Sequence, residues 1–105
     1  MTTADRLAEF CGVTTSSFYE HWQGTDGRWH EQRWDPEHDR NHLAIVLTAC
    51  EDQGLLPEVQ DRLWRAWTRI EHDCDCPSKY GLWLLTIAPA TICQAVIAVL
   101  DERGL

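Results

Sequence analysis

Lysine is nearly missing from this chain of 105 residues, because Lys79 is the only lysine among its nine basic residues. No apolar run reaches about 18 residues, the length at which a helix can cross a bilayer. The first residues, Met-Thr-Thr-Ala-Asp-Arg, include an acid where a signal peptide has its basic region, and no long apolar segment follows them. We therefore expect a soluble cytoplasmic protein that is neither secreted nor held in a membrane.

The motifs of common enzyme sites are also missing. There is no G-x-S-x-G nucleophile elbow and no phosphate-binding glycine loop, and the six glycines lie at predicted turns and helix ends. Cysteine, histidine and aspartate all occur, but their spacing selects no thiol–imidazole pair. The five cysteines are an odd number, and three of them lie within apolar helical patterns, which disfavours a disulfide scaffold. The sequence predicts no enzyme activity, no catalytic residue and no cofactor.

Acidic residues and tryptophan are abundant in the chain. Seventeen aspartates and glutamates against nine basic residues give a net charge of −8, and there are six tryptophans. This charge repels phosphate backbones, and the arginines form no basic stripe, so direct nucleic-acid binding is disfavoured and a basic protein partner is favoured. Solubility and helix capping are the commoner explanation of surplus acid. A chain of this length forms one domain, residues 1–105, around a single core.

The first third of the chain has clear helix and turn signals. Thr2 or Thr3 caps a helix that ends at Gly12, with apolar residues at helical spacing between them. Residues 14–34 are rich in aromatic and β-forming residues on both sides of the turn signal Gly24-Thr25-Asp26-Gly27. We expect a small β-hairpin there.

Two further helices are predicted in the middle of the chain. Asp35-Pro36-Glu37 combines a capping acid, a proline suited to the first helical position and a second acid, so a helix should begin there and end at Gly54. Another helix should follow Pro57, because the apolar residues up to Ile70 fit helical spacing better than strand alternation.

The last third is harder to assign from its pattern. Residues 71–79 are polar and include a proline, which predicts a loop, whereas residues 80–87 are apolar and short enough to be helix or strand. Pro89 starts a helix to about Arg103 that is apolar nearly all round, so it is central or forms a dimer interface. The predicted class is mainly α with a short hairpin near the N-terminus. The alternative is α+β with strands at 62–70 and 80–87.

Two groups of residues could hold a metal ion. His72, Cys74 and Cys76 offer zinc donors, but one residue separates the cysteines instead of roughly two to four, and no second pair completes the site. We predict no metal site and keep these three residues as weak candidates. His38 and His42 lie one helical turn apart, but the glutamate of the HExxH motif is missing between them, so surface histidines are the simpler interpretation.

Trp64 and the acids near it are the best candidates for binding a partner. Trp64 falls off the apolar stripe of the helix predicted after Pro57, and an exposed tryptophan beside charged residues is typical of an interface anchor. The acids should be exposed at helix ends and in loops, where they could imitate a phosphate backbone and occupy a basic channel. The predicted partner-binding residues are Glu58, Asp61, Trp64, Glu71, Asp73 and Asp75.

Three stretches of the chain resemble small proteins encoded by tailed bacteriophages and prophages. They are Leu7-Ala-Glu-Phe-Cys-Gly12, Trp34-Asp-Pro-Glu-His-Asp-Arg-Asn41 and Leu82-Trp-Leu-Leu-Thr-Ile-Ala-Pro89, the last leading into Ile92-Cys-Gln-Ala-Val96. The resemblance implies a phage accessory gene whose product acts in the host cytoplasm. Such small acidic phage proteins include inhibitors of host defence, among them anti-CRISPR proteins and DNA-mimicking anti-restriction proteins.

The resemblance and the charge together predict a non-enzymatic inhibitor. It would bind a host nucleic-acid-handling defence complex, such as a CRISPR effector, through an acidic surface. The alternative function is a small zinc-binding module built on His72, Cys74 and Cys76, or a structural interaction module. The all-round apolar last helix makes a homodimer possible in either case.

Overall fold

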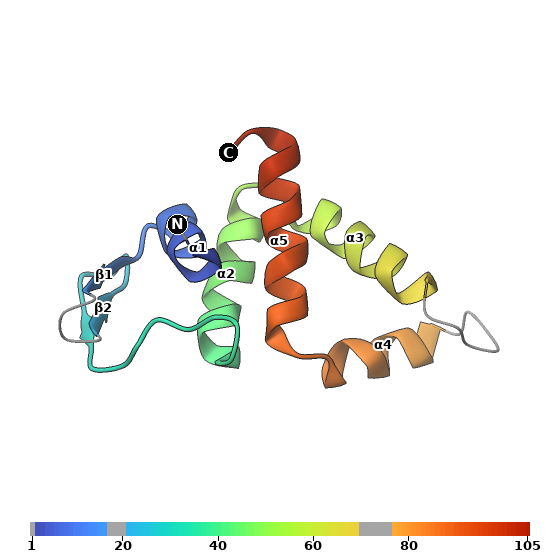
Figure 1. Ribbon diagram of the computed structural model, residues 1–105, viewed down its shortest axis with the longest axis horizontal. Coiled ribbons are helices and arrows are strands. Elements are labelled where there is room, and N and C mark those ends of the chain that lie inside the picture. Colours follow the sequence, from blue (N-terminus) through green and yellow to red (C-terminus); the bar gives the residue numbers. More distant parts are fainter. Residues whose placement is uncertain (1, 17–20, 70–76) are drawn as a thin grey trace.

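The computed structural model describes residues 2–16, 21–69 and 77–105. This part of the chain folds into five helices and a small three-stranded antiparallel sheet, which confirms the predicted mainly α class (Figure 1). The molecule is elongated, with extents of 48 × 27 × 23 Å. The sheet lies at one end, α3 and α4 lie at the other, and α5 stands between them (Figure 1).

Helix α1, Thr3–Cys11, begins and ends where its sequence predicts. The Asp5 backbone N–H donates to the Thr2 hydroxyl at 3.1 Å and the Thr2 backbone N–H donates to the Asp5 carboxylate at 3.3 Å, so the two residues form a capping box. Gly12 ends the helix in the left-handed region at φ 73°, a conformation that glycine adopts without steric cost.

The predicted hairpin is present and gains a third strand. Strands β2, His21–Gln23, and β3, Trp29–His30, pair antiparallel on either side of the predicted turn, where the Gly24 N–H donates to the Arg28 carbonyl at 3.1 Å. Strand β1, Thr14–Ser16, pairs with the other edge of β2. Trp22 is buried in the middle strand and turns toward the helices.

Helix α2, Arg40–Asp52, begins later than the sequence predicts, so the expected start at Asp35-Pro36-Glu37 is wrong. Asp39 is the N-cap, and its carboxylate accepts from the N–H groups of Asn41 at 2.8 Å and His42 at 3.3 Å. The predicted end is close to the observed one, because Gly54, at φ 71°, follows the C-cap residue Gln53.

Long-range contacts explain the late start of α2. The Asp35 N–H donates to Nδ1 of His42 at 3.0 Å, and the Pro36 carbonyl accepts a hydrogen bond from the Cys93 thiol of α5 at 3.4 Å. Pro36 is fully buried. These contacts fix residues 35–38 as a turn, and the helix starts only at the next available capping acid.

The remaining helices are α3, Leu56–Thr68, α4, Pro77–Thr86, and α5, Pro89–Arg103. The alternative strands at 62–70 and 80–87 are therefore wrong over residues 62–68 and 80–86, which are helical. The loop predicted over 71–79 is wrong at 77–79, because Pro77 starts α4, a position that suits its fixed φ and missing N–H. Residues 71–76 lie outside the described part.

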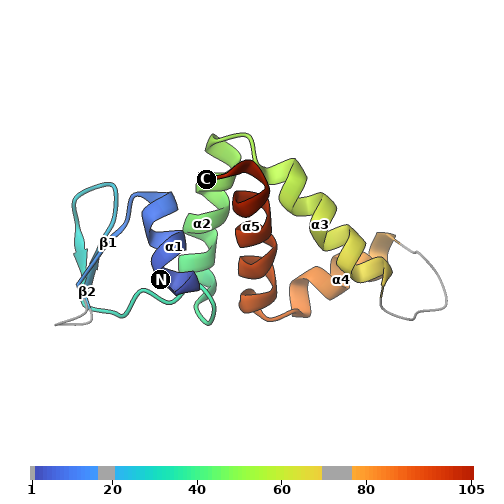
Figure 2. The same ribbon diagram turned by 45° about the horizontal axis from the view of Figure 1, so that its top comes forward.

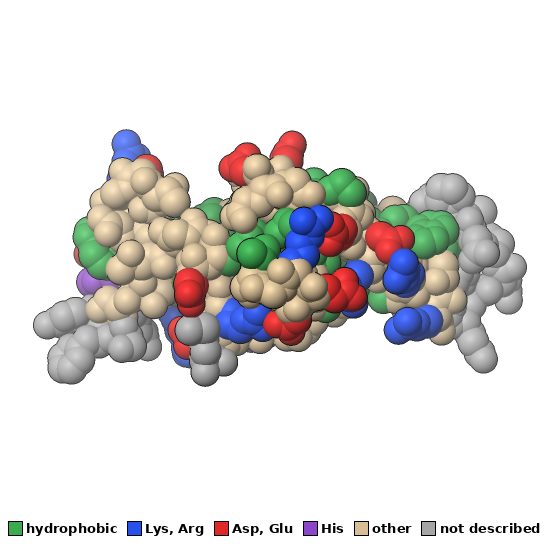
Figure 3. All heavy atoms as spheres, turned by 90° about the horizontal axis from the view of Figure 1, so that it is seen from above, with side chains coloured by type: hydrophobic (Ala, Val, Ile, Leu, Met, Phe, Trp, Pro, Cys, Tyr) green, Lys and Arg blue, Asp and Glu red, His purple; other side chains and the backbone are tan. Residues whose placement is uncertain are grey.

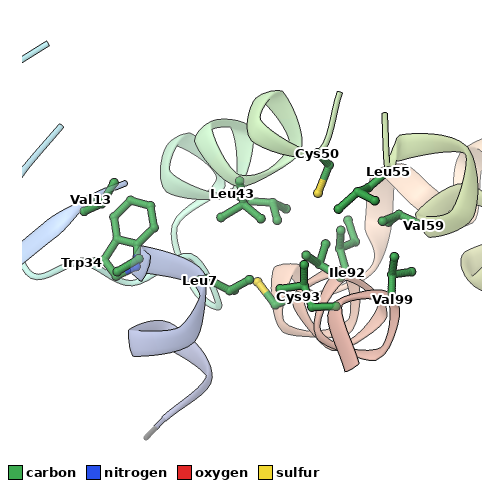
Figure 4. Close-up of a cluster of buried hydrophobic side chains, with 14 of the residues drawn as sticks. Leu7, Val13, Trp34, Leu43, Cys50, Leu55, Val59, Ile92, Cys93 and Val99 are labelled. Atoms are coloured by element: carbon green, nitrogen blue, oxygen red, sulfur yellow. The ribbon is translucent and has the colours of Figure 1, made fainter. Parts of the chain in front are cut away.

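Helix α5 is central, the first of its two predicted roles. Figure 2 shows it between α2 and α3, and it also packs against α1. In Figure 4 buried side chains from α1, α2 and α3 converge on Ile92, Cys93 and Val99 of α5. In the described part of the chain, the largest fully buried side chains are Leu7, Pro36, Val46, Cys50, Val59, Cys93, Val96 and Val99.

None of the described helices is by itself long and apolar enough to span a membrane. Tyr80–Thr86 and Pro89–Arg103 meet the length and composition requirement only as a pair, and the two helices are bent by 104° at the break between them. Much of α5 is buried against other helices of this domain, which explains its apolar composition.

Because Asp39 and not Asp35 is the N-cap of α2, alanine substitutions at the two positions should differ in their effect on the free energy of unfolding. Asp39→Ala should lower the free energy of unfolding by about 1 kcal/mol, because two backbone N–H groups of the first turn lose their acceptor. Asp35→Ala should lower it less, since its carboxylate bonds the exposed His38 ring. Urea unfolding followed by circular dichroism measures both variants. A larger loss for Asp35→Ala would contradict the assigned cap.

Candidate protein-binding surface

Trp64 stands on a cluster of aromatic side chains between α3 and α4. Its ring lies 4.8 Å from Tyr80, centroid to centroid and edge-on at 81°, and 5.2 Å from Trp67. Tyr80 in turn lies 5.5 Å from Trp67 and 6.1 Å from Trp83. These four residues, Trp64, Trp67, Tyr80 and Trp83, are called the aromatic cluster below. Such distances and tilted geometries are the favourable ones for aromatic pairs.

The cluster gives Trp64 a fixed position at the surface. Trp67 belongs to the buried stripe of α3 and is 4 % exposed, whereas Trp64 borders that stripe and is 37 % exposed. Burial of Tyr80 against α3 also raises the pKa of its hydroxyl. Trp64 is therefore held by packing on one side and open to solvent on the other, which is the arrangement of an anchor that loses little entropy on binding.

Ion pairs surround the exposed side of α3. Each of three acids there lies within ion-pair distance of one arginine, and these six charges balance. Figure 3 shows the resulting mixture of acidic and basic side chains on the face seen from above. The pairs are Glu58 with Arg103, Glu102 with Arg62, and Asp61 with Arg65 at 2.9 Å.

These ion pairs mean that two of the predicted site residues are not free acids. Glu58 and Asp61 lie on α3 with Trp64, as the sequence predicts, but each is already neutralised by an arginine. The pairs are partly exposed, so they contribute little to stability and can exchange partners with another protein. With Pro57 they line a shallow cavity of about 310 Å³ between α3 and the end of α5.

Two acids at the end of α2, beside this face, have no arginine partner among the described residues. Within the described residues no arginine lies in ion-pair distance of Glu51 or Asp52, both of which are exposed. The end of α2, the start of α3 and the end of α5 lie together along the upper edge of the molecule, near its middle (Figure 1). That edge is therefore acidic. Its acids are Glu51, Asp52, Glu58, Asp101 and Glu102, three of which are paired with arginine.

The other predicted residues fall outside this part of the chain. Glu71, Asp73 and Asp75, and the weak zinc candidates His72, Cys74 and Cys76, lie outside the described residues. The surface also contains residues that the sequence did not single out. These are Tyr80, Arg62, Arg65 and Arg103. A helical assignment of 80–87 would have suggested Tyr80 as a neighbour of α3, whereas Arg103 meets Glu58 only through the packing of α5 on α3.

The described cysteines are poorly suited to nucleophilic chemistry. Burial raises the pKa of the Cys11 thiol to about 12, that of Cys50 to about 11 and that of Cys93 to about 12. All three are free thiols and stay protonated near neutral pH, where they pack as small apolar groups. Among the residues that the structure describes, no group of three or more histidines, cysteines or acids could hold a metal ion.

His38 and His42, which the sequence placed on one helix face, occupy different environments. The His38 side chain is 80 % exposed and bonds the Asp35 carboxylate, whereas the His42 side chain is 4 % exposed. The predicted surface position is therefore wrong for His42. Its ring stacks on Trp34 at 5.2 Å and meets the edge of Trp22 at the same centroid distance.

The hydrogen bonds of His42 require a neutral ring. Nδ1 accepts from the Asp35 N–H, so it has no proton, and Nε2 lies 3.3 Å from Oε1 of Gln32 and donates to it. Burial lowers the pKa of His42 below its ordinary value of 6.5. The carboxylates of Asp39 and Asp35 oppose this shift, and His30 adds to it. Protonating Nδ1 would break the hydrogen bond that fixes the turn before α2.

His42 therefore predicts a loss of stability in weak acid. Below pH 6.5 the unfolded chain binds a proton at this residue that the folded chain excludes, so the free energy of unfolding falls until the pH reaches the lower pKa of the folded state. The difference between the urea unfolding midpoints at about pH 7.5 and at about pH 5.5 measures this loss of stability. His42→Gln should reduce the difference, and His38→Gln, which changes an exposed ring, should keep it. An unchanged difference in His42→Gln would contradict this role.

Comparison of the chain with protein-family models, with curated proteins and with solved structures found no match at the threshold applied. Function is therefore inferred from the surface around Trp64, from the charge and from the resemblance described above.

Proposed function

We propose that this chain is a non-enzymatic inhibitor that binds, in stoichiometric amounts, a host nucleic-acid-handling defence complex such as a CRISPR effector. The observation that carries the proposal is the half-exposed Trp64, fixed on the aromatic cluster and bordered by arginine–carboxylate pairs. Tryptophan and arginine are enriched among the residues that dominate binding energy, and they work best when a polar rim excludes water around them.

The charge of the chain supports a basic partner. The described ion pairs use five arginines, Arg6, Arg28, Arg62, Arg65 and Arg103, within the molecule. Seventeen acids against nine basic residues leave the surplus negative, and Glu51 and Asp52 are part of it. Both lie in the last turn of α2, where the helix dipole disfavours acids, so helix stability does not account for them. Attraction of a basic partner does account for them.

The resemblance to small phage proteins supports the biological setting. It favours action in the host cytoplasm, against a complex whose nucleic-acid channel is basic. Fold and origin do not by themselves determine function, so the identity of the partner rests on a direct experiment.

Capture from a host lysate, with Trp64→Ala as the key variant, tests the proposal. The immobilised chain should retain a CRISPR or restriction complex from lysates that contain one, identified by mass spectrometry. Trp64→Ala should weaken binding by about 30-fold or more, as expected for a buried interface anchor. Trp29→Ala is the matched control, because Trp29 is 54 % exposed on β3 at the other end of the molecule, and it should bind normally.

Two results would contradict this site. Retention that does not depend on the defence complex would remove the proposed partner. Equal binding by Trp64→Ala and Trp29→Ala, with both variants folded by circular dichroism, would remove the surface around Trp64.

The unpaired acids at the end of α2 make a separate prediction about the association rate and its dependence on salt. Association should slow as salt rises, and Glu51→Lys with Asp52→Lys should slow it by about 10-fold at low salt through loss of electrostatic attraction. These residues have no arginine partner in the described part, so the change breaks no ion pair there. Glu31→Lys with Glu37→Lys changes the net charge equally, away from the end of α2. Stopped-flow or surface binding kinetics compares the two variants, and equal rates would argue against a localised acidic site.

A further inference from the structure

The side of α4 that faces away from α3 is apolar and uncovered. Leu82 is 62 % exposed and Leu85 is 77 % exposed, and residues three apart share one side of a helix. Tyr80 and Trp83 belong to the aromatic cluster on the inner side. Among the described elements α4 packs against α3 alone, and Figure 1 shows it along the lower edge of the molecule, with no other element beneath it.

This surface lies in the one long part of the chain that contains no acid. From Pro77 to Leu100 the sequence has no aspartate or glutamate, and Lys79 is its only charged residue. All seventeen acids of the chain lie outside this stretch. Within α5 the apolar residues are explained by burial in the core, but Leu82 and Leu85 of α4 are not buried, so packing within one molecule does not explain them.

We propose that a second copy of this chain covers the outer side of α4. In a two-fold symmetric dimer, Leu82 and Leu85 of one copy meet the same residues of the other, which requires only that the surface match itself. An apolar helix face without acids satisfies that requirement. The contact uses Leu82 and Leu85 on the outer side of α4, whereas the contact proposed for Trp64 uses a ring of α3 that packs against Tyr80 on the inner side of α4.

Charge selects a second copy over other occupants. An anionic membrane surface repels a chain of net charge −8, and a basic protein gains no attraction from a surface without acids. Two copies repel each other least where their acids are absent, which is at α4. The ten residues of α4 form a helix about 15 Å long. One side of so short a helix buries less than the roughly 800 Å² per partner of a typical stable interface. The dimer is therefore weak and depends on concentration.

Sedimentation equilibrium across a range of protein concentrations tests the dimer. The mass should rise from 12.1 kDa toward twice that value as concentration increases through the micromolar range. Added salt should strengthen the dimer by screening the repulsion between two acidic chains. Salt has the opposite effect on binding to a basic partner, so failure of the dimer and failure of the proposed function are distinguishable.

Variants locate the contact on α4. Leu82→Glu with Leu85→Glu should weaken the dimer by more than about 100-fold, because two apolar side chains are replaced by like charges. Leu105→Glu is the matched control, since Leu105 is 63 % exposed at the C-terminus, and it should dimerise like the original chain. Leu85→Ala adds no charge and should weaken the dimer while keeping the helical circular dichroism signal. A chain that stays at 12.1 kDa at all concentrations, or a dimer unaffected by these α4 variants, would overturn the proposal.

Discussion

The need to cover α5 on all sides is the constraint on which the rest of the structure depends. A helix with apolar residues nearly all round cannot pack on one side only, because the others would be left in water. Helices α1, α2 and α3 each take one side of it. The sheet and α4, which have no place on α5, lie at the two ends, and the molecule is correspondingly long at 48 Å.

Features that depend on near neighbours could be predicted from the sequence. The capping box of Thr2, the left-handed Gly12 and the proline that opens α5 all act within a few residues, so their sequence signals are complete in themselves. Asp35-Pro36-Glu37 had an equally good local signal and was wrong. There the decisive contacts come from His42 and from Cys93, which is 57 residues from Pro36. A local signal loses when long-range contacts use the same backbone groups.

The candidate surface was predictable in part, for the same reason. Trp64 could be placed on an exposed side of α3 because helical spacing separates it from the apolar stripe. Its support by Tyr80 was not predicted, because the short apolar pattern of residues 80–87 left helix and strand open, and only a helix there places Tyr80 against α3. Glu58 seemed a free acid because Arg103, its partner, is 45 residues away and reaches it only when α5 packs on α3.

The position of α5 also explains how charge is distributed over the surface. Its C-terminal end, with the end of α2 and the start of α3, reaches solvent and has acids, some paired with arginine and some not. Its N-terminal end continues from α4, and this whole stretch has no acid. The fold thus separates this charged edge from the side of α4, which has no acid. In the two proposed contacts, salt would weaken attraction to a basic partner at the first surface and relieve repulsion between two copies at the second, so the two contacts should respond to ionic strength in opposite directions.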